Sequence, residues 1–380
     1  MRVVVVGAGL GGVTAAVGLR RQGHQVTLYE RGAELREAGT GVVIMPNGLR
    51  ALEELGYDLR GRSTPARDAG LRDWRGRPLL VTDAVRAQRE VGSMIVADRA
   101  ELHRALRAPL PAEAVRTATP VERLEPGVDG VAVFSDGERV DEADAVIVAD
   151  GIGSGLRGQL FPGHGGARRI GRMDLRGTLS RPEGLDVREL LAGILLDRRT
   201  GAMFGLFPIG ADELYWFTDS VLPDPVPGPE EARERMLALM ADWHPAVPAL
   251  LAATAADDIH VDPIACLAEP LPTFAIGGIA LLGDAAHAMT PDLGQGASQA
   301  FEDAAALARH LSGAGPAEVA ERLSRYDAQR RPRANRLMRA AERQSRLTSQ
   351  TGAAAWARDI LLRAIPARLA TRRLAAIWHA

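Results

Sequence analysis

Three glycines near the start of the chain have the spacing of a phosphate-binding turn. Gly7, Gly9 and Gly12 form GxGxxG, which follows four consecutive valines and precedes an apolar, helix-like stretch that opens at Leu10. Gly7 permits a tight turn, Gly9 lets the backbone approach a pyrophosphate, and Gly12 lets the helix pack closely on the strand. The unpaired N–H groups at the start of such a helix attract anions. We therefore predict a dinucleotide-binding turn formed by Gly7, Gly9, Leu10 and Gly12.

An acidic residue follows the glycine turn at the spacing expected for ribose recognition. Glu30 ends a second strand-like run, residues 25–30, about twenty residues beyond the glycines. Its carboxylate can accept hydrogen bonds from the ribose hydroxyls of an adenosine. Strand, helix, strand and terminal acid together predict a βαβ nucleotide site. They do not distinguish NAD from FAD.

A second glycine-punctuated turn lies almost a chain length away, in residues 281–304. Asp284 ends a short apolar run there, where its carboxylate could bond the ribityl chain of FAD, a polyol that NAD lacks. The following loop has no bulky side chains and opens a helix, whose N-terminus can stabilise an anion by roughly 0.3 to 2 kcal/mol. The first turn is thus predicted to hold the ADP half of FAD and the second the flavin half. His287 is expected to bond within its own turn rather than to transfer protons. The loop residues assigned to the flavin are Pro291, Gly294, Gln295, Gly296 and Ala297.

Hydrophobic patterns divide the chain into a nucleotide domain and an insert. Unbroken β-branched runs beside the glycine turns indicate buried parallel strands, whereas residues 168–275 alternate short strand-like runs with Gly, Pro, Asp and Glu. We predict an α/β fold: a Rossmann-like FAD-binding domain with an inserted, mostly antiparallel β-sheet substrate domain and C-terminal helices. The predicted ranges are 1–70, 95–165 and 276–330 for the discontinuous FAD-binding domain, 71–94 and 166–275 for the substrate domain, and 331–380 for the helical tail.

Composition argues against several other classes. The 380 residues carry a net charge of -2, so no global basic field points to nucleic acid. The one cysteine, Cys266, can form no internal disulfide, which suits a reducing cytoplasm, and no metal site is predicted. No run reaches the ~18 to 20 apolar residues of a membrane span. The arginine-rich tail could lie on a membrane, but packing against the protein or a partner subunit is favoured. We expect a monomer or a homodimer.

The order of the motifs resembles that of the group A FAD-dependent aromatic monooxygenases, which share the para-hydroxybenzoate hydroxylase-like fold. The pattern is most similar to the single-component salicylate and urate hydroxylases. The resemblance implies that Glu30 and Arg31 hold the adenosine, and that Gly41 and Val42 belong to the cofactor site. It also implies roles for Arg99 at the FAD backbone, Val121 at the adenine, Asp150 at the pyrophosphate and nicotinamide access, and Asp284 at the ribityl chain. The motifs that carry it are GAGLGG at 7–12, GTGVVIMPNGLRAL at 39–52, DRAEL at 98–102, VADGIGSGLR at 148–157 and GDAAHAMTPDLGQG at 283–296.

The resemblance implies a reaction as well. NADH or NADPH docks transiently and reduces FAD, and O2 then forms a flavin C4a-hydroperoxide that hydroxylates an aromatic or polyketide-like small molecule. An epoxidase of the same fold and a non-catalytic FAD-binding scaffold are the alternatives. Flavin-dependent halogenases share the fold but need an active-site lysine, and all 46 basic residues of this chain are arginines. A plain NAD dehydrogenase leaves the Asp284 turn unexplained.

The substrate is expected between the flavin and the inserted sheet. Period-two alternation in residues 202–219 places Met203, Gly205 and Phe207 on one face, and Tyr215 and Phe217 in a second row. With Met45, these side chains are the predicted substrate contacts. The predicted catalytic residues are Tyr215, which could orient or deprotonate a phenol, and Arg176, which either reaches the pocket or braces the sheet. The urate hydroxylases resembled here need an arginine where this chain has Met203, which favours a more apolar ring than urate.

Overall fold

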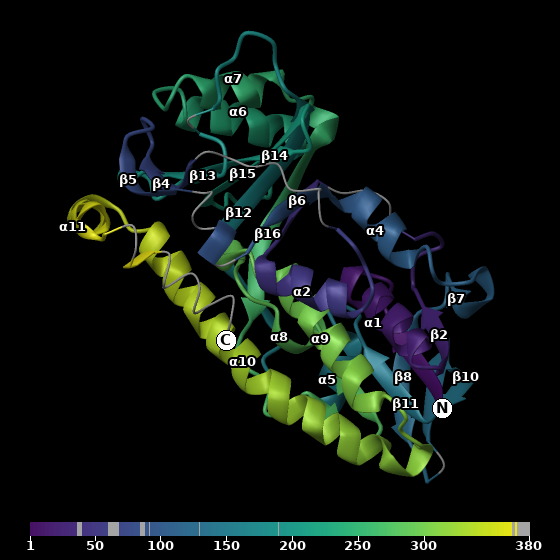
Figure 1. Cartoon of the computed structure of the whole chain (residues 1–380). Coiled ribbons are helices and arrows are strands. Elements are labelled where there is room, and N and C mark those ends of the chain that lie inside the picture. The colour runs from purple at the N-terminus through teal and green to yellow at the C-terminus, as the bar shows by residue number, and fades with distance from the viewer. Residues whose placement is uncertain are drawn as a thin grey trace.

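Four β-sheets are found in the part of the chain that the computed structural model describes (Figure 1). The described residues are 1–35, 40–59, 68–83, 88–90, 92–128, 130–188, 190–366 and 369–370. A six-stranded sheet and a seven-stranded sheet form the two main units, and a three-stranded and a two-stranded sheet complete the set. Gly39, in one of the quoted motifs, and residues 371–380 of the predicted tail lie outside the described residues.

The six-stranded sheet is built around the valine run. Its parallel core brings β1 between β11 and β2, and the side chains of Val3, Val4, Val5 and Val6 are all buried. Unbroken apolar strands suit this position because helices cover both faces of a parallel sheet. In spatial order the strands are β17 (Ala275–Ile276), β18 (Ile279–Leu281), β11 (Ala145–Val148), β1 (Arg2–Val6), β2 (Gln25–Tyr29) and β7 (Val115–Arg116).

Helices pack on this sheet and on one another. The glycine turn opens α1 (Leu10–Arg21), and the late turn opens α9 (Gly296–Leu311), which packs against α1, α2 (Pro46–Glu54) and α10 (Val319–Thr348). Figure 1 shows α10 as a long helix along the edge of the molecule, with α11 (Gly352–Ala364) at its far end. Two turns far apart in the sequence therefore open two helices that lie side by side.

The seven-stranded sheet is antiparallel except between β13 and β4. One face packs on α6 (Pro229–Leu239) and α7 (Ala246–Ala253) through a core that includes Phe204, Leu206 and Trp216. The opposite face carries the alternate residues of the same strands, which are therefore turned away from α6 and α7. In spatial order the strands are β16 (Ile259–Leu267), β12 (Ala167–Ser180), β15 (Glu213–Val221), β14 (Met203–Ile209), β13 (Gly193–Leu196), β4 (Asp68–Asp73) and β5 (Pro78–Asp83).

Two smaller sheets complete the fold. β8 (Val121–Pro126), β9 (Val131–Ser135) and β10 (Glu138–Ala143) form a meander, with a tight turn at Asp136 and Gly137 whose φ angles are 51° and 79°. β3 (Gly41–Ile44) pairs with β6 (Ile95–Asp98), just before α4 (Arg99–Arg107). The β3–β6 pair lies between the glycine-rich turns and the seven-stranded sheet, where the cofactor and substrate sites were predicted to meet. The remaining short helices are α5 (Gly155–Leu160) and α8 (Asp284–His287).

Candidate cofactor and substrate site

The first glycine turn leaves open space at one of its three glycines and none at the other two. A Cβ atom added at Gly12 would lie 1.9 Å from the carbonyl oxygen of Gly7, and one at Gly7, whose φ is +101°, would lie 2.3 Å from the carbonyl oxygen of Ala149. A Cβ at Gly9 would meet nothing within 4 Å. Gly7 and Gly12 are therefore required by the turn itself, whereas the space beside Gly9 fits the approach of a pyrophosphate.

This contrast gives a matched pair of variants. Gly9→Ala is expected to leave the stability of the FAD-free chain unchanged, because Gly9 is extended with φ -68° and ψ 177°, but to weaken FAD binding by about tenfold or more, a loss of roughly 1.4 kcal/mol or more. Gly12→Ala should destabilise the FAD-free chain itself by about 1 to 3 kcal/mol through overpacking. Thermal unfolding without FAD and FAD titration separate the two effects. If Gly9→Ala binds FAD as tightly as the wild type, the pyrophosphate does not lie in the space beside Gly9.

The residues predicted at the adenosine lie at the ends of neighbouring strands. Glu30 accepts hydrogen bonds from the backbone N–H groups of Ala8 at 2.9 Å and Gly32 at 2.8 Å, so its carboxylate closes the glycine turn. The segment before β8 bonds to the same place, because Thr119 N–H donates to the Glu30 carbonyl at 3.0 Å. Val121 begins β8 and is half-buried, and Arg31 is exposed. Glu30 and Arg31 thus follow β2, and Val121 begins β8 two residues beyond the bond to Glu30.

Asp150 follows β11 at the carboxyl edge of the six-stranded sheet. Its Oδ1 atom is buried and has no hydrogen-bond partner among the described residues, and burial raises the pKa of its carboxyl group. Buried polar atoms are almost always partnered, so an orphaned oxygen beside the glycine turn fits a ligand that binds there. Asp284 lies exposed at the first position of α8, on the other side of Arg157, which donates to the carbonyls of Ile152 at 2.6 Å and Ala285 at 3.2 Å.

The second turn packs against the β3–α2 segment. The N–H of Met45 donates to Ser298 Oγ at 3.0 Å, and a Cβ at Gly294 would lie 2.6 Å from the methyl carbon of Met45. A Cβ at Gly296 would meet nothing within 4 Å. The first N–H groups of α9 have no intrahelical partner and face this space with the positive end of the helix dipole. The arrangement fits the anionic edge of a reduced flavin.

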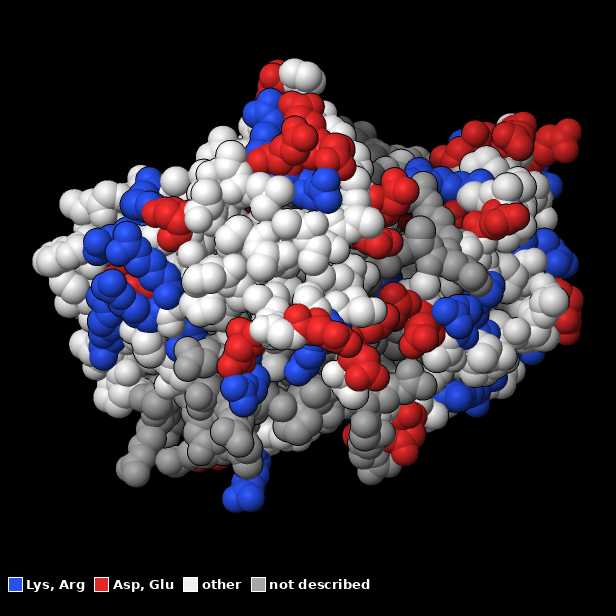
Figure 2. All heavy atoms as spheres, turned by 90° about the horizontal axis from the view of Figure 1, so that it is seen from above, with Lys and Arg blue, Asp and Glu red and all other residues white. Residues whose placement is uncertain are grey.

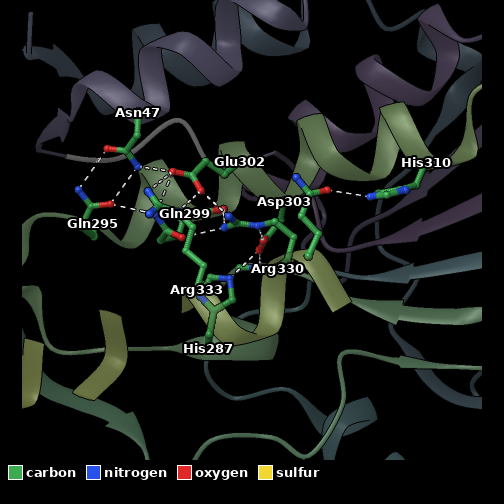
Figure 3. Close-up of polar contacts among 11 residues, drawn as sticks. Asn47, His287, Gln295, Gln299, Glu302, Asp303, His310, Arg330 and Arg333 are labelled. Atoms are coloured by element: carbon green, nitrogen blue, oxygen red, sulfur yellow. Dashed lines mark hydrogen bonds and ion pairs between the residues drawn. The ribbon is translucent and has the colours of Figure 1, made fainter. Parts of the chain in front are cut away.

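A buried polar network holds the second turn in place (Figure 3). Arg330 of α10 donates from Nε to Asp303 at 2.6 Å, pairs with Glu302 and donates from Nη2 to Gln299 at 2.7 Å. Asp303 in turn accepts the Gly283 N–H at 2.9 Å and lies 2.6 Å from Nε2 of His287. The expected bond of the His287 side chain within its own turn is therefore wrong, since its partner is on α9. Burial alone would raise the pKa of Asp303, but His287 and Arg330 outweigh it and hold that pKa at about 2.

The same network reaches α2 through side-chain amides. Asn47 donates to Gln295 at 3.0 Å and to Glu302 at 2.6 Å, and Gln299 donates to Gln295 at 2.9 Å. The side chain of Gln295, predicted to bind the cofactor, is thus engaged with α2 and α9, as Figure 3 shows. Its backbone is the part that borders the open space at Gly296.

Four of the five predicted substrate contacts share one face of the seven-stranded sheet. Gly205 pairs with Phe217 and Phe207 with Tyr215 across β14 and β15, so the two predicted rows are neighbours on that face. The rings of Phe207 and Phe217 stack with centroids 6.1 Å apart, and a Cβ at Gly205 would lie 2.2 Å from the Phe217 ring. Met203 lies farther along, in a cluster with Leu79 and Leu196. Met45 is not on this sheet but beside the flavin turn.

Tyr215 connects this face to the cofactor side. Its ring packs on β3, where a Cβ at Gly41 would lie 2.5 Å from Tyr215 Cγ. Burial raises the pKa of Tyr215, Asp174 raises it further, and Arg176 and Arg99 lower it. The pKa of the neighbouring Arg99 side chain is lowered by burial and by the positive charge of Arg176. Two arginines thus converge on one tyrosine at the junction of the two units.

Arg176 is also part of the sheet's own charge pattern. Its Nε lies 3.2 Å from Asp174 Oδ2, and it pairs with Asp262 on β16. It therefore braces β12 against β16 beside Tyr215, while its reach into the substrate pocket stays a prediction. Burial raises the pKa of Asp174 to about 8, an effect opposed by Arg176, and burial likewise raises the pKa of Asp219 to about 7.

Several residues of the site were not predicted from the sequence. They share a position inside the α9–α10–α2 network rather than on a turn, and they are Asn47, Ser298, Gln299, Glu302, Asp303, Arg330 and Arg333. The available signal was the run of Gln299, Glu302 and Asp303 within an otherwise alanine-rich helix, where helical spacing places them on one face. Buried polar residues of this kind need partners from elsewhere.

The fold, with a phosphate turn, an unpartnered Oδ1 atom of Asp150 and a helix dipole at one junction, defines a flavin nucleotide-binding protein. The chain belongs to the FAD binding domain family, whose model matches residues 1–341. Among its relatives, the aurachin C monooxygenase/isomerase of Stigmatella aurantiaca is 32% identical over 374 residues, 96% of this chain and 94% of that protein. The FAD-dependent urate hydroxylase of Klebsiella pneumoniae is 31% identical over 360 residues, 92% of this chain and 90% of that protein.

Solved structures agree with this assignment. Klebsiella pneumoniae HpxO complexed with FAD and uric acid superposes with a TM-score of 0.90 at 28% identity, covering 100% of this chain and 97% of that one. A salicylate hydroxylase substrate complex superposes with a TM-score of 0.80 at 26% identity, covering 100% and 95%. The predicted fold, the cofactor FAD and the enzyme class, an FAD-dependent monooxygenase, are confirmed by these relatives.

Proposed function

We propose that this chain is a single-component monooxygenase that hydroxylates an apolar aromatic or polyketide-like small molecule in the cytoplasm, with NADH or NADPH and O2 as co-substrates. The observation that carries the proposal is the aromatic face of β14 and β15, which meets β3 of the cofactor side at Gly41 and Tyr215. FAD, when bound, supplies the two-electron reduction of O2 and the transfer of one oxygen atom.

The residues of this chain then have three tasks. The glycine turn and Asp150 hold the ADP half of the cofactor, while Gly296 at the start of α9 leaves room for its flavin end. The apolar side chains of Phe207 and Phe217 exclude water from the reacting atoms, since solvent would divert the oxygen to hydrogen peroxide. Tyr215 orients a ring hydroxyl of the substrate, and the neighbouring Arg99 and Arg176 favour the anionic form of that hydroxyl.

The substrate class follows from the polarity of that face. Met203, Phe207 and Phe217 present no charge to a bound ring. The relatives named above carry the names of rings of different polarity, urate and an aurachin. The apolar character of this face favours a ring of low polarity over urate. An epoxidation of the same kind of substrate is the alternative reaction.

A substrate screen tests the proposal. FAD-loaded protein is mixed with NADH or NADPH and a panel of phenols, quinolones, aromatic polyketides and urate, while pyridine nucleotide and O2 consumption are followed and products are analysed by mass spectrometry. We expect at least one apolar ring to accelerate both and to gain one oxygen atom, whereas urate does not. If no compound stimulates turnover, the chain is better described as a non-catalytic FAD-binding scaffold.

Tyr215→Phe extends the same assay. The variant should keep its FAD and lower kcat on the preferred substrate by about 10² or more, as expected for loss of a positioned acid–base group. Tyr57→Phe is the matched control, because the Tyr57 hydroxyl donates to the Leu106 carbonyl at 2.6 Å, in a different part of the core. Equal kcat in both variants would remove Tyr215 from the catalytic residues.

A further inference from the structure

The outer face of α11 is apolar along its whole length. Ala353, Trp356, Ala357, Ile360, Leu361 and Ala364 follow one another at spacings of three, one, three, one and three, and all are exposed. Trp356 is 56% exposed and Leu361 66%. This is the spacing of a helix stripe that normally packs on a partner. Single exposed apolar residues are common, but a complete stripe of them marks an interaction surface.

The opposite face of α11 is firmly attached to the protein. Arg358 is buried and donates to the carbonyls of Leu347 at 3.0 Å and Thr348 at 2.8 Å, which caps the C-terminus of α10. Its guanidinium also pairs with buried Asp359 at 2.8 Å. Leu362, on the same side, packs against the cluster of Leu79, Leu196 and Met203. These contacts fix the orientation of α11, so its apolar stripe faces solvent.

Positive charge accompanies the stripe. Arg336, Arg339, Arg343 and Arg346 are exposed at spacings of three, four and three along the second half of α10, which ends where α11 begins. Glu342 is the one acidic residue between positions 328 and 348. At the left end of the face that Figure 2 shows, basic side chains gather beside uncharged ones.

We propose that α11 and the second half of α10 dock on an anionic lipid surface. An apolar stripe containing tryptophan, leucine and isoleucine, accompanied by basic residues, is the chemistry of a helix that lies in the interface of a bilayer. Anionic headgroups provide the complementary charge for the arginines. A two-fold dimer through the same apolar stripe is the competing occupant, and the test below distinguishes it. No helix among the described residues could cross a bilayer, so the contact is peripheral.

Docking through α11 would place the apolar face of the seven-stranded sheet close to the lipid. The helix that contacts lipid on one side contacts, through Leu362, the cluster that includes Met203 on the other. A protein docked in this way holds its sheet one helix away from the hydrocarbon. The docking itself does not depend on the proposed reaction and is tested without it.

Vesicle flotation of the FAD-loaded full-length chain tests the docking. Vesicles of phosphatidylcholine and phosphatidylglycerol in equal parts should carry the protein upward, vesicles of phosphatidylcholine alone should not, and added sodium chloride should weaken binding. Trp356→Ser with Leu361→Ser should lower the partition coefficient by about tenfold or more. Arg339→Gln with Arg343→Gln should lower it about fivefold for each arginine.

Two controls use substitutions of the same kind at surfaces outside the proposed docking site. Val128→Ser removes an apolar side chain that is 102% exposed just after β8. Arg322→Gln with Arg325→Gln removes two arginines at the start of α10, which pair with Glu318 and Glu321. Both should bind vesicles like the wild type. FAD content and melting temperature verify that each variant is folded. The proposal is overturned if no vesicle binds, if the controls fall as much as the test variants, or if light scattering shows a dimer that the Trp356 and Leu361 substitutions dissociate.

Discussion

Replacing Arg330 by methionine is expected to lower the free energy of unfolding by about 3 to 5 kcal/mol, the usual loss when one partner of a buried ion pair is removed. Arg330 is 3% exposed and pairs with both Glu302 and Asp303. Without it Glu302 would keep Arg333, but the fully buried Asp303 would lose its arginine. Asp303 also fixes the Gly283 N–H and His287. The variant should therefore lose FAD affinity as well as stability.

Arg325→Met is the control on the same helix. Arg325 forms an exposed pair with Glu321 four residues away, and such pairs contribute at most about 1 kcal/mol. Urea unfolding and FAD titration of both variants give the comparison. If Arg330→Met unfolds like Arg325→Met, the network is not what holds the second turn.

The network also predicts loss of stability in acid. Asp303 has its pKa held at about 2, below its unfolded value of about 3.9, so its contribution is fully present above pH ~4. As the pH falls from about 4 to about 2, the unfolded chain takes up this proton first and stability declines. Asp303→Asn should remove this part of the acid transition, which urea unfolding at several low pH values measures.

The sequence predicted the backbone features of the site better than its side-chain partnerships. GxGxxG after a valine run and a second glycine loop before a helix are local patterns, because tight turns and helix starts depend on residues close in sequence. Gly7, Gly12 and Gly41 occupy positions where the structure leaves no room for a side chain. Alternation in β14 and β15 was equally local, and it placed Phe207 and Tyr215 on one face.

Side-chain pairs between segments far apart in the chain could not be predicted from local sequence patterns. Asp303 and Arg330 are 27 residues apart on two helices, and Asn47 reaches Glu302 across 255 residues. The hydrophobic period of α9 indicates that Asp303 is buried, but it does not say which cation compensates it. The bond expected for His287 failed for this reason, since the acceptor came from another helix.

Asp174 provides the second large effect, a stability that falls as the pH rises. Burial raises the pKa of its carboxyl group to about 8, and Asp219 and Asp262 add to the effect while Arg176 opposes it. The folded chain therefore keeps a proton on Asp174 that the unfolded chain loses near pH ~4. Between about pH 4 and pH 8 the folded state binds more protons, so its stability declines with rising pH by at most about 1.4 kcal/mol per pH unit for this group.

Asp174→Asn keeps the shape of the side chain and removes the titration. Relative to the wild type, its free energy of unfolding should increase steadily between pH ~5 and pH ~8, as measured by urea unfolding at each pH. The control is Asp186→Asn, because Asp186 is exposed in a turn and its pKa is lowered by Arg188, which places its titration below this range. Asp186→Asn should show a difference that does not vary across it.

The outcome decides which of two opposing forces dominates at Arg176. Arg176 Nε lies 3.2 Å from Asp174, and an ion pair at that distance favours the charged carboxylate, whereas burial with three other acids nearby favours the neutral one. If the difference in free energy of unfolding between Asp174→Asn and the wild type does not change with pH, then Asp174 and Arg176 are both ionised throughout. Asp174 then neutralises the charge of Arg176 within the sheet. A difference that grows with pH would mean that Asp174 is neutral, which leaves Asp262 as the acid that pairs with Arg176 and more of the positive charge of Arg176 to act on Tyr215 and on a bound phenolate.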